Sequence, residues 1–181
     1  MFPLNVPNVL TVIRILLVPV LVVALLVNTE NGSWVAAAVF ALAACTDGLD
    51  GYIARSRQSV TTFGKVMDPV ADKLLIAAAL ISLVSLDRVA AWVAMVIIAR
   101  EFAVSGLRIA AGQQGVVISA SLLGKVKTIV QVAGVFVLIA VNDTGEEWVQ
   151  VLVYAAVVVT VVSGVDYFLN VRRRIEEART A

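Results

Sequence analysis

Four aspartates are the residues of this chain whose spacing is best suited to chemistry. Asp47 and Asp50 are three residues apart, and Asp68 and Asp72 are four residues apart. Residues three or four positions apart lie on the same face of an α-helix, which rises about 1.5 Å per residue. Each pair is therefore expected to present two carboxylates on one side of a helix. The chain between the pairs can turn back, so that the two pairs face one another.

Four carboxylates at close range favour a divalent-metal site, because they repel one another and metal ions are their natural counter-charge. The chain contains no histidine and a single cysteine, Cys45, which excludes histidine ligation and a thiolate cluster. Oxygen ligands favour a hard cation such as Mg²⁺ or Mn²⁺. Two such ions would suit phosphoryl transfer, because they neutralise phosphate oxygens. The alternative is that the aspartates pair at a solvated helix end with Arg55, Lys65 and Lys73.

Small residues accompany the aspartates and leave room for a bulky headgroup to approach the backbone. They are Gly48, Gly51, Ala54 and Gly64. Arg55 follows the first aspartate pair, and its planar guanidinium can bind phosphate or stack on a base. The segment therefore predicts a site for a ligand that carries both phosphate and a nucleobase.

The composition predicts an integral membrane protein. Of 181 residues, 61% are hydrophobic, and the mean hydropathy is +0.98. Soluble domains contain about 45–50% apolar residues.

The net charge of +1 gives no overall attraction to nucleic acid, which we do not expect as a partner. The N-terminus has no basic run and no small-residue cleavage site, so its apolar stretch is expected to be a retained first helix.

Six apolar stretches approach the length of about 20 helical residues that a bilayer core requires. We expect one all-α transmembrane catalytic domain over residues 1–181, with a short cytoplasmic C-terminal tail. Its six helices are expected at about residues 9–27, 34–55, 69–86, 89–111, 122–141 and 148–170.

The charges beside these stretches predict the orientation. The loops expected on one side carry one basic residue, Arg88, and five acidic ones, Glu30, Asp87, Asp143, Glu146 and Glu147. The other side carries Arg55, Arg57, Lys65, Arg172, Arg173, Arg174 and Arg179. The positive-inside rule then places both termini and the aspartates at the cytoplasmic face of a multi-pass protein of the cell (inner or plasma) membrane.

A second cluster of charge predicts a pocket for an anionic acceptor. Arg100, Glu101 and Arg108 lie in the fourth stretch, and Lys125 and Lys127 begin the fifth. Several cations that converge inside a membrane protein favour binding of an anion. The alternative is that the lysines extend to lipid headgroups while Glu101 neutralises one arginine.

The aspartate segment resembles the signature of the CDP-alcohol phosphotransferase family, D-x2-D-G-x2-A-R-x8-G-x3-D-x3-D. Its eight fixed positions are filled by Asp47, Asp50, Gly51, Ala54, Arg55, Gly64, Asp68 and Asp72. The resemblance implies the six-helix fold of that family. It also implies that Asp47, Asp50 and Asp68 bind metal, and that Asp72 is both a ligand and the general base. Gly51, Arg55 and Thr61, with Ala54 and Gly64 beside them, would then hold CDP-diacylglycerol.

Three further segments resemble the phosphatidylglycerophosphate synthase branch of the family. They are Pro7-Asn8-Val-Leu-Thr11-Val-Ile-Arg14, Arg100-Glu101-Phe-Ala-Val-Ser-Gly-Leu-Arg108 and Ser121-Leu-Leu-Gly124-Lys125-Val-Lys127-Thr128. The branch transfers the phosphatidyl group of CDP-diacylglycerol to sn-glycerol 3-phosphate. The products are phosphatidylglycerol phosphate and CMP, in the committed step of phosphatidylglycerol synthesis. By this resemblance, Arg100, Arg108, Lys125 and Lys127 bind the acceptor phosphate, and Asn8 and Arg14 lie near the lipid or nucleotide.

Other interpretations of the sequence remain open. The acceptor could be that of a cardiolipin synthase or of a phosphatidylinositol phosphate synthase. Buried carboxylates also occur in cation-coupled transporters, although the acids here cluster at one membrane edge and no inverted repeat is visible. A purely structural membrane protein is the third alternative. Contact with membrane lipids is expected in every case, and the small residues of the helices favour a homodimer.

Overall fold

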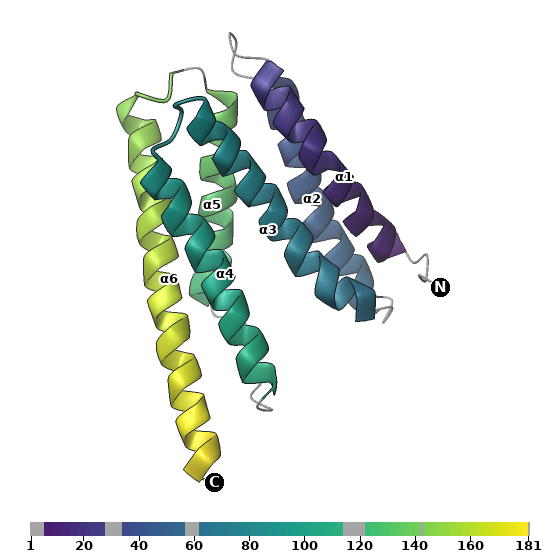
Figure 1. The fold of residues 1–181 in the computed structure, drawn as a ribbon, viewed down its shortest axis with the longest axis vertical. Coiled ribbons are helices and arrows are strands. Elements are labelled where there is room, and N and C mark those ends of the chain that lie inside the picture. Colours follow the sequence, from purple (N-terminus) through teal and green to yellow (C-terminus); the bar gives the residue numbers. More distant parts are fainter. Residues whose placement is uncertain (1–5, 28–33, 57–61, 114–121, 142, 181) are drawn as a thin grey trace. The chain divides into compact units, whose positions relative to one another are not determined.

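The computed structural model describes residues 6–27, 34–56, 62–113, 122–141 and 143–180, with side chains in 8–27, 34–46, 67–113, 122–141 and 143–176. Within this part of the chain every regular element is a helix (Figure 1). The helices are α1 (Val6–Val27), α2 (Trp34–Ser56), α3 (Thr62–Ser85), α4 (Ala91–Gln113), α5 (Leu122–Ala140) and α6 (Glu147–Thr180). The expected all-α class is confirmed.

Two helix boundaries differ from the sequence-based expectation. α3 begins at Thr62, seven residues before the expected start at Pro69, which lies inside the helix. Proline removes one backbone hydrogen bond, but neighbouring helices compensate for this in a membrane protein. The end of α6 expected at residue 170 is also wrong, because the helix continues to Thr180. Its polar extension carries an ion pair between Arg172 Nε and Glu176 Oε1 (2.9 Å), four residues apart, which supports a helix.

The described residues form two compact units. The first contains α1, α2, α3 and the C-terminal end of α5 from Val135 onward. The second contains α4, the remainder of α5 and α6. The single catalytic domain expected for residues 1–181 stays a prediction.

In the first unit, α1 packs against both α2 and α3 (Figure 1). The buried positions of α1 recur every three or four residues, as expected for one face of a helix. They are Asn8, Thr11, Arg14, Val18, Leu21 and Leu25. The N-terminal half of this face is therefore polar and the C-terminal half apolar. A buried polar half must find hydrogen-bond partners on the neighbouring helices, which gives α1 more than a packing role.

The remaining surface of α1 is exposed and apolar, with Val12, Leu16 and Val23 as examples. Three helices are long and apolar enough to cross a membrane, over Asn8–Val27, Leu122–Ala140 and Glu147–Glu176. They indicate a membrane protein. In contrast, α3 carries four charged residues and α4 carries three, and these include residues of the predicted sites. The number of helices that cross the bilayer stays a prediction.

The turn after α3 is fixed by backbone and side-chain hydrogen bonds. The backbone N–H groups of Asp87 and Arg88 donate to carbonyls of the last turn of α3, and Asp87 has a left-handed φ of 54°. This pattern is the Schellman motif that commonly ends a helix. Arg88 Nη1 then donates to the carbonyls of Leu138 (3.3 Å) and Ile139 (3.1 Å). Arg88 therefore caps the end of α5, where helix carbonyls lack intrahelical partners.

In the second unit, α4 packs against α6 (Figure 1). Val104, Ala111, Tyr167 and Val171 form a buried cluster, and Leu107 and Ile175 pack against it. These positions recur at helical spacing and define the face that each helix turns toward the other. On α4 this apolar contact follows Arg100 and Glu101 in the chain.

Candidate active site

Asp68 is the predicted metal ligand whose surroundings are best defined. It lies half-buried on α3, and Thr11 Oγ1 of α1 donates a hydrogen bond of 2.5 Å to its Oδ1. The Thr11 side chain is fully buried. A buried hydroxyl that donates to a carboxylate fixes the rotamer of that carboxylate and leaves its other oxygen available. This is the usual arrangement of an outer-shell partner behind a metal ligand.

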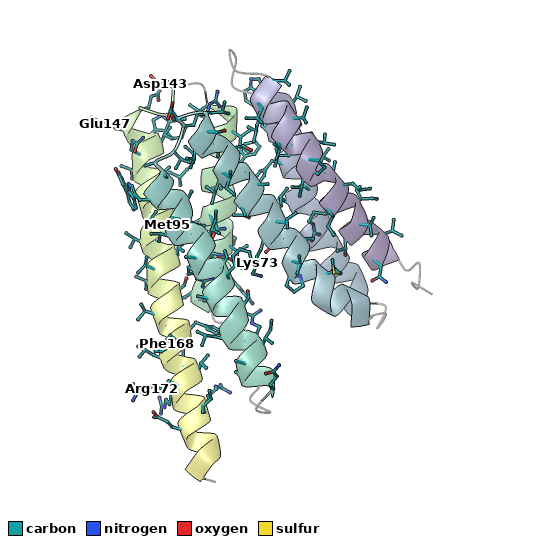
Figure 2. The ribbon with its side chains drawn as sticks, viewed as in Figure 1. Lys73, Met95, Asp143, Glu147, Phe168 and Arg172 are labelled. Atoms are coloured by element: carbon teal, nitrogen blue, oxygen red, sulfur yellow. The ribbon has the colours of Figure 1, made fainter. Side chains whose placement is uncertain are left out.

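Asp72 follows Asp68 by one helical turn and is also half-buried. The neighbouring Lys73, labelled in Figure 2, donates from its Nζ to the Pro69 carbonyl of its own helix (3.1 Å). The charge of Lys73 is therefore held at the backbone of α3.

The other members of the aspartate motif lie on helical backbone. Asp47, Asp50, Gly51, Ala54 and Arg55 belong to α2, and Gly64 belongs to the first turn of α3. Their side chains lie outside the described ones, and Thr61 lies outside the described residues altogether. The expected helical spacing within each aspartate pair is present. Among the described side chains there is no group of three metal-ligating residues, since half of the predicted ligand set falls outside them.

The donors that the motif offers suit a hard divalent cation. Asp68 and Asp72 present carboxylate oxygens one helical turn apart and half-exposed. Mg²⁺ and Mn²⁺ prefer such oxygen ligands, and a soft metal would require sulfur or imidazole. The described residues therefore fit a divalent cation.

A polar group of α1 lies beside these acids in the first unit. Asn8 is 6% exposed, and Arg14 is completely buried. An arginine is almost never fully buried unless its charge is compensated. Together with Thr11, these residues form the buried polar half of the α1 face. The expected location of Asn8 and Arg14 near the lipid or nucleotide stays a prediction.

The second unit holds a network built around Glu101. Glu101 Oε1 lies 2.5 Å from Lys127 Nζ and 3.2 Å from Arg100 Nη1. The three side chains are only 12%, 6% and 14% exposed. Arg100 Nη2 also donates to Ser163 Oγ of α6 (3.0 Å). Glu101 is therefore shared by an arginine and a lysine, whereas the alternative considered from the sequence paired it with one arginine alone.

The two remaining cations of the predicted acceptor pocket are exposed. Lys125 lies at the surface of α5. The guanidinium of Arg108 lies 5.7 Å from the ring centroid of Tyr167 on α6, a cation–π contact. Arg100, Val104 and Arg108 all contact α6, so they lie on one face of α4. The structure thus brings Arg100 and Lys127 together and leaves Lys125 and Arg108 outside that network.

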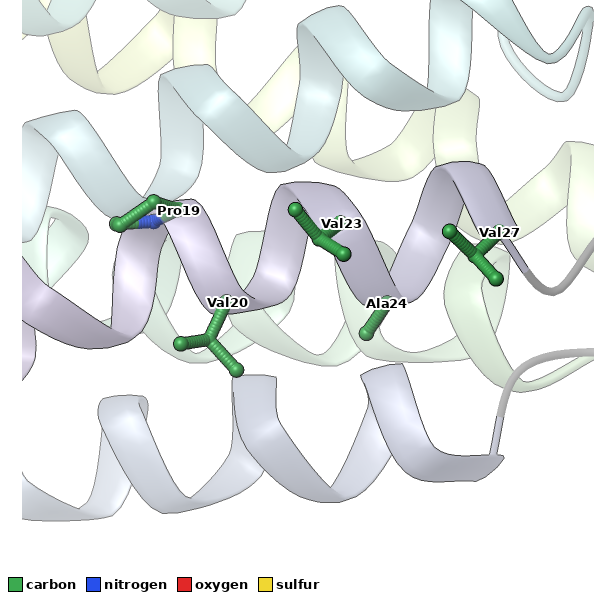
Figure 3. A pocket seen from close by; sticks show the side chains of 5 residues that line it. All are labelled: Pro19, Val20, Val23, Ala24 and Val27. Atoms are coloured by element: carbon green, nitrogen blue, oxygen red, sulfur yellow. The ribbon is translucent and has the colours of Figure 1, made fainter.

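An open depression on α1 has a different character. It is lined by Pro19, Val20, Val23, Ala24 and Val27 (Figure 3). All five side chains are apolar, so the depression offers no group that could bind a diphosphate or a metal ion. It lies toward the C-terminal end of α1, away from Asn8 and Thr11 in the helix, and we assign it no part in the chemistry.

Four residues beside the predicted sites were not expected from the sequence to be site residues: Thr11, Ser163, Gly164 and Tyr167. Single small polar residues in apolar helices rarely stand out, because most of them bond to their own backbone. A usable signal was present in their spacing. Asn8, Thr11 and Arg14 recur every three residues, and Thr160, Ser163 and Tyr167 recur at three and four, so each set occupies one helix face.

Comparison with known proteins identifies the family. The CDP-alcohol phosphatidyltransferase family model matches residues 4–162. A Bacillus subtilis protein named CDP-diacylglycerol–glycerol-3-phosphate 3-phosphatidyltransferase is 41% identical over 180 residues, covering 91% of this chain and 93% of its own. A Rickettsia felis protein of the same name is 39% identical over 170 residues, with 91% and 93% coverage. A Mycobacterium tuberculosis protein named probable phosphatidylglycerophosphate synthase is 42% identical over 176 residues, with 94% and 83% coverage. The chain belongs to the CDP-alcohol phosphatidyltransferase family.

Proposed function

We propose that this protein transfers the phosphatidyl group of CDP-diacylglycerol to sn-glycerol 3-phosphate, which yields phosphatidylglycerol phosphate and CMP. The observation that carries this proposal is the similarity, over nine-tenths of the chain, to relatives named for that reaction. The complete aspartate signature and the cationic network of α4, α5 and α6 are consistent with it. The reaction is the committed step of phosphatidylglycerol synthesis.

Members of this family use divalent metal ions. We propose that Asp47, Asp50, Asp68 and Asp72 hold two ions, either Mg²⁺ or Mn²⁺. Bound there, the ions would neutralise the diphosphate and stabilise the departing CMP. The oxygen-only donor set supports this choice, and the hydrogen bond from Thr11 to Asp68 supports a fixed geometry at one ligand.

Asp72 is the proposed general base. A base must lie within hydrogen-bond reach of the attacking hydroxyl and must be unprotonated. Asp72 would take the proton of the 1-hydroxyl of glycerol 3-phosphate. The resulting oxygen attacks the phosphorus that carries diacylglycerol, and the bond from that phosphorus to the CMP oxygen breaks. The proton leaves on Asp72, and the leaving electron pair stays on CMP.

The two substrates use different residues. Gly51, Ala54, Arg55, Thr61 and Gly64 would bind CDP-diacylglycerol together with Asn8, whose buried position supports a role in shaping the site. Arg55 would hold the phosphate of departing CMP. Arg100, Arg108, Lys125 and Lys127 would bind the phosphate of the acceptor, with the first and last supported by their network around Glu101.

The proposed setting is a homodimer in the cell (inner or plasma) membrane, with the aspartates at the cytoplasmic face. Apolar helices support the membrane location. The excess of basic residues beside the aspartates supports the orientation. Small residues along the helices support close contact between two copies. Surrounding lipids would occupy the exposed apolar surface of α1.

The test is CMP release by the purified protein. CDP-diacylglycerol and glycerol 3-phosphate are supplied with Mg²⁺, with Mn²⁺ or with a chelator. We expect release that requires both substrates and a metal. Asp72→Asn should lower it by about 10²- to 10⁴-fold, the usual contribution of a general base. Asp87→Asn in the exposed turn after α3 is the matched control. Undiminished activity in Asp72→Asn would contradict the mechanism, and absence of CMP release by the unaltered protein would contradict the function.

A further inference from the structure

Arg100 lies in a seat made by its own helix and by α6. Glu101 Oε1 contacts both Arg100 Nη1 and Lys127 Nζ, so its carboxylate is shared between two cations. Ser163 and Gly164 contact it from α6. We refer to Glu101, Ser163 and Gly164 as the arginine seat. All three lie in the second unit.

The Ser163 hydroxyl is oriented by a hydrogen bond within its own helix. Its hydroxyl donates its only proton to the Thr160 carbonyl one turn earlier in α6 (3.0 Å). The lone pairs of Ser163 Oγ are therefore directed outward, and one accepts from Arg100 Nη2 (3.0 Å). Ser163 is 1% exposed, so water does not compete for this bond. The acceptor for Arg100 is thus fixed in direction as well as in place.

Gly164 lets the arginine lie against α6. A Cβ atom built on Gly164 would stand 3.2 Å from Arg100 Cγ and 3.6 Å from Arg100 Nε. The first distance is tighter than an ordinary carbon–carbon contact, so the arginine stem would have to move away from α6. Movement of the stem carries the guanidinium away from Ser163. Glycine at this position therefore determines where the charge of Arg100 stands.

The network is not closed on itself. Two cations, Arg100 and Lys127, share the carboxylate of Glu101 in a largely buried cluster. Arg100 Nε, Gln131 Oε1 and Tyr167 Oη are also buried without a hydrogen-bond partner among the described residues. A network built only for stability would satisfy its charges and polar atoms. Two buried cations on one carboxylate and unsatisfied polar atoms nearby together favour an anion with further hydrogen-bonding groups.

We propose that the arginine seat is a positioning device that sets the affinity of this enzyme for the phosphate of its acceptor. Glu101, Ser163 and Gly164 do not themselves bind the acceptor; they hold Arg100 and Lys127 where the phosphate meets both. The inference rests on the proposed function, because it takes the acceptor to be a phosphate ester.

Gly164→Ala tests the proposal with one added methyl group. The matched control is Gly106→Ala on α4, where an added Cβ meets nothing within 4 Å. Both changes add the same atoms to a helix and favour the helix equally. We expect Gly164→Ala to raise the KM for glycerol 3-phosphate about tenfold, in line with the sensitivity of bound geometry to small displacements. The KM for CDP-diacylglycerol should stay unchanged, and Gly106→Ala should alter neither. Equal behaviour of the two variants would overturn the proposal.

Ser163→Ala supplies an independent test that adds no atoms, in case the methyl group at residue 164 prevents folding. It should also raise the KM for glycerol 3-phosphate and leave that for CDP-diacylglycerol unchanged. A second measurement avoids turnover: the rise in Tm that glycerol 3-phosphate produces in the metal-loaded protein. We expect this rise in the unaltered protein and in Gly106→Ala, and a smaller one in both seat variants.

The outcomes separate the two proposals. A normal Tm rise and a normal KM in both seat variants would overturn the positioning role and leave the proposed function intact. No Tm rise and no turnover with glycerol 3-phosphate in the unaltered protein would overturn the acceptor, and the seat proposal with it.

Discussion

Asp68 and Arg100 are both oriented by a hydroxyl group of a neighbouring helix, but the hydrogen bonds run in opposite directions. In each, a buried hydroxyl from a neighbouring helix fixes a charged side chain: Thr11 donates to Asp68, and Ser163 accepts from Arg100. The difference is in the counter-charge. Arg100 has Glu101 beside it, whereas Asp68 makes no ion pair with the side chains that the structure describes.

This difference indicates how each region treats its ligand. Two carboxylates one helical turn apart are suited to a metal ion as their counter-charge. A cationic pair that shares an internal carboxylate needs an anion less strongly, so it can bind a substrate and then release it. We infer that the first unit holds a resident cofactor and that the second handles a substrate that must exchange.

The largest effect should come from removing charge on the acidic side. Asp68→Asn keeps the size of the side chain and an oxygen that can accept from Thr11, but it removes the negative charge. Loss of a metal ligand should cost several kcal/mol of transition-state stabilisation, or about 10²- to 10⁴-fold in kcat/KM. Initial rates at increasing Mg²⁺ and Mn²⁺ measure the loss. Full activity at ordinary metal concentrations would remove Asp68 from the metal site.

An intermediate effect is expected from the hydroxyl behind Asp68. Thr11→Val preserves shape and removes the donor, so the carboxylate loses its fixed orientation. Outer-shell partners of this kind contribute about 10- to 100-fold in metal affinity or activity. The measurement is the metal concentration that gives half-maximal rate, and Thr11→Ser should restore it. If valine and serine behave alike at this position, the hydrogen bond has no role in metal binding.

The smallest effect should come from the counter-charge on the cationic side. Glu101→Gln leaves Arg100 and Lys127 without their shared carboxylate, which should cost on the order of 1–3 kcal/mol of stability. For a chain of this size that is a decrease in Tm of about 2–4 °C per kcal/mol. Added glycerol 3-phosphate should raise the Tm of this variant less than that of the unaltered protein, because Arg100 and Lys127 are no longer held together by the Glu101 carboxylate. An equal rise in both would contradict a role for Glu101 in the arginine seat.

The two regions also differ in how far the sequence could predict them. The aspartates match a signature of fixed spacing, because two carboxylates can share one ligand only when they lie on the same helix face. Both pairs do lie on helical backbone, as their spacing predicts. Around Arg100 the residue types were predictable, but the pairing was not. Whether Glu101 pairs with Arg100, with Lys127 or with both depends on how α4, α5 and α6 pack. A single sequence does not give the distances between side chains on different helices.

The locations of the helices were predictable from the sequence, but two of their ends were not. The apolar periods located all six helices, since bilayer thickness and backbone hydrogen bonding restrict their length. The early start of α3 and the long extension of α6 are not predicted by the sequence, because proline and a run of charged residues commonly mark a helix end. Pro69 is tolerated inside α3. After Asn170 the apolar face of α6 continues with Val171 and Ile175, while Arg172 pairs with Glu176.

The most direct test of the account is the identity of the alcohol that receives the phosphatidyl group. Purified protein with metal and CDP-diacylglycerol would be offered glycerol 3-phosphate, inositol phosphate and phosphatidylglycerol together, and the lipid products separated by mass. The account predicts phosphatidylglycerol phosphate as the dominant product, formed in step with CMP. Cardiolipin or phosphatidylinositol phosphate as the dominant product would contradict it.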